Sequence, residues 1–278
     1  MRVLVTNDDG FESDGIKELA TRLAEEHEVW LVAPDGEKSG ASHSITLRDS
    51  IRARCLGERR YACKGTTADC VIVSLLGLVP PKVDMVISGI NHGPNLGTDI
   101  LFSSTAAGAR QGALMGVPSV AVSLGAYAPP FDFSCAADFT ARNLGVFRDL
   151  WTDDHFLNIN FPAKAARHPD SVITFPSRRI YRDRLNTYRA PNGDTYCFVH
   201  GAVPDSHVEP GSDCQVLSEG KISISPIHAH PRNWVSIELR SRCAFQRSSS
   251  TRIAAAMMPK TRSSAGVTVK PSRYNKLR

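Results

Sequence analysis

Residues 2–33, RVLVTNDDGFESDGIKELATRLAEEHEVWLVA, contain a complete strand–helix–strand unit. Two short apolar runs, Val3–Thr6 and Val29–Ala33, flank a segment, 14–26, in which apolar residues recur at helical spacing. These residues are Ile16, Leu19, Ala20 and Leu23. Because parallel strands need a crossover connection of about this length, the stretch predicts a β-α-β unit with both strands in one sheet.

The same alternation of strands and helices continues to residue 160. A loosely alternating segment, Ile45–Leu56, is expected to add a hairpin or an edge strand. Further helices are expected at 66–78, 103–115 and 136–151, and further strands at 85–88, 119–123 and 156–160. Helices that alternate with short, fully apolar strands are typical of a parallel sheet covered on both faces. We therefore expect an α/β fold, Rossmann-like, with a doubly wound and mostly parallel sheet.

The pattern changes after Pro162. Helical periodicity fades, and two β-type segments, Leu185–Arg189 and Tyr196–His200, flank the turn signal Asn192-Gly193. A further strand is expected at Ile222–Ile227. The expected organisation is an α/β core in 1–162, a β-rich extension with a hairpin in 163–239, and a basic, disordered tail in 240–278.

The net charge of +5 is unevenly distributed along the chain. Ten of the 33 Lys and Arg residues lie in 240–278, which contains no Asp or Glu, so residues 1–239 have a net charge of −5. Nucleic-acid binding is therefore expected only through the tail. With 42% hydrophobic and 22% charged residues, the chain is neither collagen-like nor a disulfide-rich miniprotein, and it is not wholly disordered.

Three features favour a cytoplasmic protein. The first apolar run has only four residues before two carboxylates, which is unlike a signal peptide. The longest mostly apolar stretch, Val71–Pro81, is about half the length of a membrane span, so no membrane partner is expected. The seven cysteines form no CxxC motif, which indicates reduced thiols and neither disulfides nor a zinc site.

Two adjacent carboxylates, Asp8 and Asp9, follow the first expected strand. Ligands of open α/β sheets bind at the carboxyl ends of strands, where two carboxylates would repel a phosphate unless a cation lies between them. Oxygen ligands suit Mg²⁺, Mn²⁺ or Ca²⁺. Both side chains can reach one cation only if the chain turns, which Gly10 permits. The alternative is that one of them caps the following helix.

Two further loops supply oxygen donors at the same edge of the expected sheet. Ser39 lies in a Ser- and Gly-rich loop after the second strand, from which its hydroxyl can reach the cation. Asn91 and Asn95 lie in SGINHGPNLG (88–97) and offer amide oxygens to a metal or N–H groups to a phosphate. Taken alone, the Ser39 loop fits an ordinary connection, and 88–97 is the stronger signal. The agreement of both loops with the carboxylate pair predicts a site.

A fourth element is the motif SSTAAG (103–108), which opens a predicted helix at Ser103. Hydroxyl groups and free amides at a helix N-terminus bind anions, so this position suits a phosphate group. The alternative is that Ser103 is an ordinary N-cap.

Together, these motifs resemble the SurE family of survival-protein nucleotidases. The resemblance rests on LVTNDDG (4–10), the Ser39 loop leading into HSIT (43–46), SGINHGPNLGTDIL (88–101) and the S-x-T start of the next helix. The segments LNINFP (157–162) and GKISISPI (220–227) are also similar to family segments and occur in the same order. The resemblance therefore covers about 1–229.

The resemblance implies a metal-dependent phosphatase that hydrolyses nucleoside monophosphates, and in some members short polyphosphate. It implies one divalent ion per subunit, Mg²⁺ or Mn²⁺. The implied metal ligands are Asp8, Asp9, Ser39 and Asn95. Asp8 and Asp9 are also the expected catalytic residues, and the residues expected to contact phosphate are Asn91, Ser103 and Thr105.

The chain departs from the family pattern at several positions. Ser104 stands where the family usually has glycine, and Thr67 where it usually has proline. The similarity fades after Ile227, which puts in doubt any subunit contact that this end normally supplies.

Two histidines and a basic segment leave alternatives open. His43, beside the Ser39 loop, is a candidate acid for the leaving group, or a histidine satisfied by a hydrogen bond in its loop. His92 is expected to face solvent. Arg178–Arg189 has five arginines and two tyrosines, which can stack on bases or form a solvated hairpin or subunit contact. The family's hairpin here serves in assembly, which favours a homodimer or homotetramer.

The main alternative function is a nucleotide-binding or sensing module of the same fold without turnover. The presence of both Asp8 and Asp9 argues against this alternative, because binding alone would not need two adjacent carboxylates.

Overall fold

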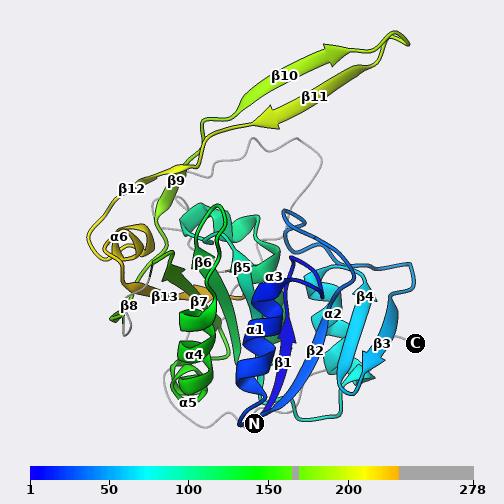
Figure 1. Ribbon diagram of the computed structural model, residues 1–278, viewed down its shortest axis with the longest axis vertical. Coiled ribbons are helices and arrows are strands. Elements are labelled where there is room, and N and C mark those ends of the chain that lie inside the picture. Colours follow the sequence, from blue (N-terminus) through cyan, green and yellow to red (C-terminus); the bar gives the residue numbers. More distant parts are fainter. Residues whose placement is uncertain (165–168, 232–278) are drawn as a thin grey trace, which may run out of the picture. The chain divides into compact units, whose positions relative to one another are not determined.

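In the computed structural model, which describes residues 1–164 and 169–231, strands from both ends of this range join one nine-stranded sheet (Figure 1). The strands of this sheet are β1 (Arg2–Thr6), β2 (Glu28–Pro34), β3 (Arg52–Gly57), β4 (Arg60–Lys64), β5 (Met85–His92), β6 (Ser119–Gly125), β7 (His155–Pro162), β8 (Ser171–Ile173) and β13 (Ile222–His228). Their order across the sheet is β3-β4-β2-β1-β5-β6-β7-β13-β8. The tail expected in 240–278 lies outside the described residues.

The sheet is mostly parallel, as expected. Parallel pairing joins β4, β2, β1, β5, β6 and β7 in an unbroken series. The antiparallel pairs are β3 with β4 and β13 with β7. Because β13 and β8 continue the same sheet, the boundary expected at residue 162 does not separate two sheets.

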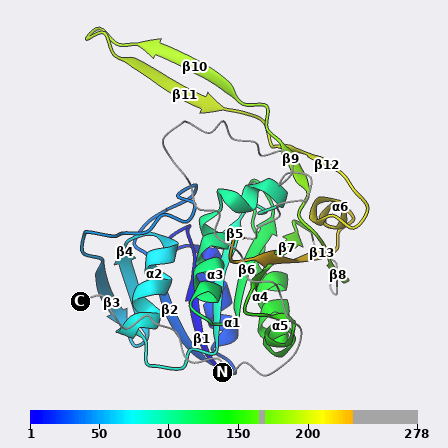
Figure 2. The same ribbon diagram turned by 180° about the vertical axis from the view of Figure 1, so that it is seen from behind.

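Helices cover both faces of the sheet (Figures 1 and 2). They are α1 (Asp14–Leu23), α2 (Thr67–Val73), α3 (Ser104–Leu114), α4 (Ser134–Arg142), α5 (Leu144–Leu150) and α6 (Asp213–Ser218). Helices α1, α4 and α5 pack on one face with Val3 and Val5 of β1, whereas Leu4 packs with α2 on the other. The alternation of β1 side chains between two apolar cores explains why this strand is apolar at successive positions.

Three expected elements differ in extent. The helix expected at 136–151 is two helices, because Asn143 has φ −113° and ψ 13° and its side chain donates to the carbonyl of Phe139. The strand expected from Ile45 begins only at Arg52. The segment before Arg52 is held outside the sheet, since Thr46 bonds to both carboxylate oxygens of Asp69. Helix α2 ends at Val73 and is followed by a π-helical turn, 74–78.

The expected hairpin is confirmed. Strands β10 (Arg184–Arg189) and β11 (Thr195–His200) pair antiparallel, with Tyr188 opposite Tyr196 and Gly193 at φ +92° in the turn. The hairpin extends from a second antiparallel pair, β9 (Arg178–Ile180) and β12 (Asp205–His207) (Figure 1). Every residue of β10 and β11 is exposed.

The strand order reverses between β1 and β5. From β1 the chain proceeds through β2 and β4 in one direction, and from β5 through β6 and β7 in the other. The carboxyl ends of β1 and β5 are adjacent, with Thr6 paired to Ser88. This switch point is the usual ligand site of such sheets, so the fold places the residues after Thr6 and after His92 at the expected position.

No helix within 1–164 and 169–231 has the length and apolar character needed to cross a bilayer.

Candidate functional site

Asp8 and Asp9 lie at the carboxyl end of β1. Asp8 is 4% exposed, and its Oδ1 accepts a hydrogen bond of 2.5 Å from the hydroxyl of Thr105. The Asp9 side chain is 9% exposed. Its Oδ1 lies 3.1 Å from Nδ1 of His92, and its Oδ2 accepts a bond from the backbone N–H of His92 (3.3 Å). Helix α1 begins after Ser13, so neither carboxylate caps it and that alternative is excluded.

Burial makes both carboxyls costly to ionise. Burial raises the pKa of Asp8 to about 6; the Thr105 hydroxyl opposes this effect and the Asp9 charge adds to it. Burial also raises the pKa of Asp9, with His92 acting in the opposite direction. Two desolvated carboxyls side by side form a site that a cation would stabilise.

The loop after β2 adjoins Asp8. Gly10 has φ +98°, and a Cβ at this position would lie 3.1 Å from the carbonyl carbon of Gly36. This tight turn lets the backbone N–H of Lys38 donate to the carbonyl of Asp8 (2.7 Å). The expected turn at Gly10 is confirmed, and it joins two of the loops predicted to form the site.

Ser104 fastens the same loop to helix α3. Its hydroxyl is buried and donates to the carbonyl of Lys38 (2.9 Å). Lys38 is therefore bonded to Asp8 on one side and to Ser104 on the other, directly before Ser39. Ser39 itself is exposed beside these contacts. The departure from glycine at 104 thus adds an anchor for the Ser39 loop.

Asn95 is 8% exposed and is held by side chains of β6 and β7. Its Nδ2 donates to the hydroxyl of Ser123 (2.8 Å), and its backbone N–H donates to Oδ1 of Asn160 (2.8 Å). Its backbone carbonyl accepts from Nδ2 of Asn158 (2.8 Å) and of Asn160 (3.1 Å). Because the side-chain nitrogen is engaged, Oδ1 of Asn95 is the atom left for a cation.

Asn91 and His92 take roles that differ from the predicted ones. Nδ2 of Asn91 donates to the carbonyls of His92 (3.2 Å) and Gly93 (2.8 Å), so a phosphate would have to compete with these two bonds. The expectation that His92 faces solvent is wrong. Its ring pairs with Asp9 and stacks on Phe131, with 4.7 Å between ring centroids.

Helix α3 presents its N-terminus at this edge. Ser103 is the N-cap, since its hydroxyl accepts from the N–H of Ala106 (3.0 Å). The N–H groups of Ser104 and Thr105 have no hydrogen-bond partner among the described residues and remain able to bind an anion. The Thr105 hydroxyl instead donates to Asp8, so this side chain supports the carboxylate.

His43 lies in a turn of the loop after β2 and contacts Gln111 of helix α3. Its Nε2 is 2.9 Å from Oε1 of Gln111, and burial lowers the pKa of the ring. A histidine that stays neutral and is already hydrogen-bonded corresponds to the alternative interpretation, in which His43 is satisfied within the fold.

The residues present fit a hard divalent cation. The edge combines two buried carboxyls with the amide oxygen of Asn95 and the hydroxyl of Ser39, all of them oxygen donors. Oδ1 of Asn7 is also buried and has no hydrogen-bond partner within the described part of the chain. No cluster of three or more His, Cys, Asp and Glu suited to a metal occurs in 1–164 and 169–231, so such a site would depend on the neutral donors.

Asp8→Asn is expected to stabilise the metal-free protein at neutral and alkaline pH. The folded pKa of about 6 lies above the ordinary 3.8, so the folded protein keeps a proton that the unfolded chain loses between these values. Stability therefore falls as the pH rises through this window, by about 3 kcal/mol in total. Asparagine carries no charge, so the variant should escape this loss.

Urea unfolding of metal-free wild type and Asp8→Asn, compared at about pH 4 and pH 8, tests this prediction. The two proteins should have similar free energies of unfolding at the lower pH, where Asp8 is protonated. At the higher pH, Asp8→Asn should be the more stable. Equal stability at both values would contradict the desolvation of Asp8.

Several supporting residues were not assigned from sequence. Asn158 and Asn160 belong to the segment LNINFP, and Ser123 to the strand expected at 119–123. All three are fully buried in apolar strands and bond to Asn95. Polar residues within apolar strands are the sequence feature that could have identified them, because buried polar groups need hydrogen-bond partners.

Comparison with known proteins finds relatives of this chain. The family model described as "Survival protein SurE" matches residues 3–183, well over half of the chain. The "5'-nucleotidase SurE" of Syntrophomonas wolfei is 40% identical over 234 residues, which cover 82% of this chain and 89% of that protein. The protein of the same name from Pseudothermotoga lettingae is 42% identical, with 82% and 88% covered.

A solved structure agrees. The crystal structure of the SurE protein from Aquifex aeolicus matches with a TM-score of 0.74 and 31% sequence identity, covering 84% of this chain and 96% of that one. This match confirms the Rossmann-like α/β fold expected from sequence.

Proposed function

The chain belongs to the SurE family, and we infer from this membership and from its site that it is a 5'-nucleotidase. We propose that it hydrolyses nucleoside monophosphates to nucleoside and phosphate, with the aid of one divalent metal ion per subunit, Mg²⁺ or Mn²⁺. The observation that carries this proposal is the pair Asp8 and Asp9 at the switch point of the sheet. Asp8 is buried and accepts a bond from Thr105 at the N-terminus of α3, and the Asp9 side chain is 9% exposed.

The residues that would hold the metal are Asp8, Asp9, Ser39 and Asn95. A bound divalent ion would supply positive charge to a phosphate oxygen and to the transition state of in-line displacement. The α3 N-terminus, with Ser103 and the free N–H groups after it, binds the phosphate. Thr105 holds Asp8 in place. Asp9 orients the attacking water, and His92 holds the carboxylate of Asp9 in position.

The same site accommodates short polyphosphate. Binding through a helix N-terminus and a cation recognises a terminal phosphate whatever is attached to it. We therefore extend the proposal to release of phosphate from short polyphosphate chains.

Release of phosphate from a panel of 5'- and 3'-nucleoside monophosphates, with Mg²⁺ or Mn²⁺ present, tests the function. Turnover of the 5'-monophosphates is expected, and p-nitrophenyl phosphate serves as the non-nucleotide reference. Tight nucleotide binding without phosphate release would contradict the proposal and favour a sensing module.

We also propose that the protein assembles as a homodimer or homotetramer through its hairpin. One face of β10 and β11 exposes Tyr188, Tyr196 and Phe198, each more than half exposed. Tyr188 and Phe198 make an edge-to-face ring contact at 5.7 Å. Exposed contiguous aromatic residues are typical of protein interfaces.

The double substitution Tyr188→Ser and Phe198→Ser is expected to weaken this assembly. Removal of two central aromatic side chains from an interface should raise the dissociation constant by about a hundredfold or more. Light scattering across a dilution series measures the molar mass. Thr187→Ala, on the opposite face of β10, is the control and should leave the mass unchanged. An unchanged mass in the double variant would contradict the role of this face.

A cytoplasmic location stays a prediction. It is supported by the free thiols of the cysteines in the described residues, Cys55, Cys63, Cys70, Cys135, Cys197 and Cys214.

A further inference from the structure

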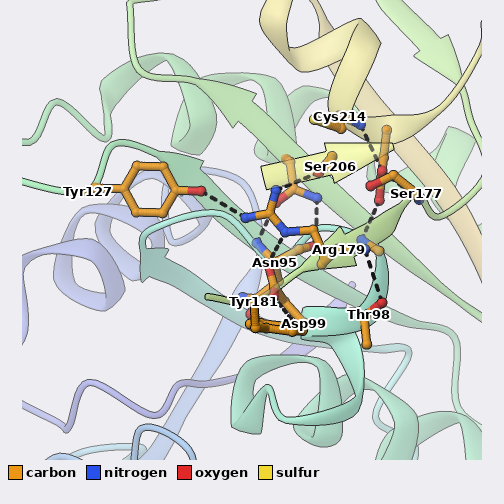
Figure 3. A network of polar contacts seen from close by, with 12 residues as sticks. Asn95, Thr98, Asp99, Tyr127, Ser177, Arg179, Tyr181, Ser206 and Cys214 are labelled. Atoms are coloured by element: carbon orange, nitrogen blue, oxygen red, sulfur yellow. Dashed lines mark hydrogen bonds and ion pairs between the residues drawn. The ribbon is translucent and has the colours of Figure 1, made fainter. Parts of the chain in front are cut away.

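The segment 93–103, here called the site loop, links two parts of the proposed site. It carries Asn95 near its start and ends at Ser103, the N-cap of α3. Residues of the chain beyond Thr174 hold it in place, as Figure 3 shows. The carboxylate of Asp213 accepts the backbone N–H of Gly97 (2.7 Å) and that of Ser177 (2.8 Å).

Arg179 of β9 is the second point of attachment. Its side chain is 3% exposed, and its Nε lies 2.9 Å from Oδ2 of Asp99 in the site loop (Figure 3). Nη1 donates to the hydroxyl of Ser206 on β12 (2.7 Å), and Nη2 donates to the hydroxyl of Tyr127 (3.3 Å). The guanidinium therefore joins the base of the hairpin to the site loop.

Asp99 connects Arg179 to the N-terminus of helix α3. Its other carboxylate oxygen, Oδ1, accepts from the hydroxyl of Tyr181 (2.6 Å). Its backbone carbonyl accepts from the N–H of Phe102 (2.9 Å) and from the N–H of Ser103 (3.0 Å). Asp99 is thus bonded through its side chain to Arg179 and through its backbone to the N-cap of α3.

The ion pair between Arg179 and Asp99 is costly to break. A buried guanidinium is stabilised by a carboxylate at close range, and loss of either partner leaves the other charge buried and unpaired. Asp99 is the carboxylate paired with Arg179 in the described part of the chain. The site loop can therefore leave its position only by breaking a desolvated ion pair.

We propose that Arg179 is a positioning residue of the active site. Through Asp99 it holds the site loop so that Asn95 and the N-terminus of α3 face the same phosphate and cation. This role rests on the proposed function. It also assigns to one arginine of Arg178–Arg189 a role other than base stacking, a solvated face or subunit contact.

Four single variants and one double variant test the proposal in the full-length protein. Arg179→Met and Asp99→Asn remove the ion pair, Arg179→Lys keeps the charge without the planar fork, and the double variant combines the first two. Ser206→Ala is the matched control, because it removes a partner of the same guanidinium on the side away from the site loop. Calorimetric Mn²⁺ binding, kcat, KM, the thermal midpoint and hydrogen exchange of 93–103 are measured for each.

Arg179→Met and Asp99→Asn are each expected to weaken Mn²⁺ binding by about ten- to a hundredfold, as loss of a residue that orients a ligand does. The double variant should bind Mn²⁺ no more weakly than the weaker of the two single variants, because both substitutions remove the same ion pair. Arg179→Lys should be intermediate. Ser206→Ala should bind Mn²⁺ within about twofold of wild type even if its thermal midpoint falls.

Hydrogen exchange keeps the test independent of catalysis. Faster exchange of 93–103 in Arg179→Met, but not in Ser206→Ala, is expected even if wild type proves inactive. In that case the proposed function fails, whereas the attachment of the site loop by Arg179 and Asp99 still stands. Unchanged exchange and Mn²⁺ affinity in folded Arg179→Met would overturn the proposal. Equal losses of Mn²⁺ affinity and of exchange protection in Ser206→Ala and Arg179→Met would also overturn it. Arg179 would then stabilise the base of the hairpin in general.

Discussion

Asp9→Asn and Asp8→Asn are each expected to lower kcat/KM for a nucleoside 5'-monophosphate by about a thousandfold or more, which is about 4 kcal/mol of transition-state stabilisation. Each substitution removes a negative charge from the set of oxygen donors while keeping its shape. Thr105 can still donate to residue 8 and His92 to residue 9, so the local fold should persist.

Steady-state kinetics and Mn²⁺ calorimetry on the same samples measure this effect. Asp35→Asn is the control, since Asp35 follows β2 at the same edge of the sheet but is exposed and lies 3.9 Å from Arg52. It should retain activity within a few fold. The central role of the pair would be contradicted if Asp9→Asn, correctly folded, kept wild-type kcat/KM. The Asp8 variant gives a second check, because it should be inactive and yet more stable without metal.

The second large effect is expected at Gly97. This residue has φ +50°, and a Cβ there would overlap the carbonyl oxygen and side chain of Ser177. Gly97→Ala should therefore push the site loop away from the chain beyond Thr174, breaking the bond from Gly97 to Asp213 and displacing Asn95. We expect at least about a tenfold loss of Mn²⁺ affinity and a loss of about 2–4 kcal/mol in the free energy of unfolding.

Gly93→Ala is the matched control in the same loop. Gly93 also has a positive φ, +95°, but a Cβ there meets no atom within 4 Å. Gly93→Ala should lower the free energy of unfolding by about 1–2 kcal/mol through backbone strain alone and leave Mn²⁺ affinity nearly unchanged. Urea unfolding and calorimetry compare the two variants. If Gly97→Ala were no worse than Gly93→Ala in both measurements, the packing of Ser177 against the loop would not position Asn95.

The sheet was predictable from sequence because its rules are local. Short apolar runs alternate with helical periodicity, which predicts βα units in one mostly parallel sheet. The strand order, and with it the switch point between β1 and β5, comes from the structure. What local patterns do not show is where a later strand joins. Strand β13 was predicted, but its insertion between β7 and β8 depends on long-range pairing, for example Ser223 with Asn160.

The candidate site was predictable in outline for the same reason. Strand ends placed Asp8, Asp9, Ser39 and Asn95 at one edge. The supporting contacts were not predictable, since they depend on which side chains meet across the fold. Thr105 was expected to contact phosphate but bonds to Asp8, and His92 was expected to face solvent but bonds to Asp9. Such contacts depend on how helix α3 and the ends of β1 and β5 pack together, and cannot be inferred from spacing along the chain.

Metal dependence of phosphate release tests the central claim most directly. Protein stripped with a chelator and then desalted is assayed with a nucleoside 5'-monophosphate before and after Mg²⁺ or Mn²⁺ is added back. We predict that stripping lowers the rate by about a hundredfold or more, and that about one equivalent of metal per subunit restores it. Full activity in the stripped protein would contradict a mechanism built on Asp8, Asp9, Ser39 and Asn95 as metal ligands.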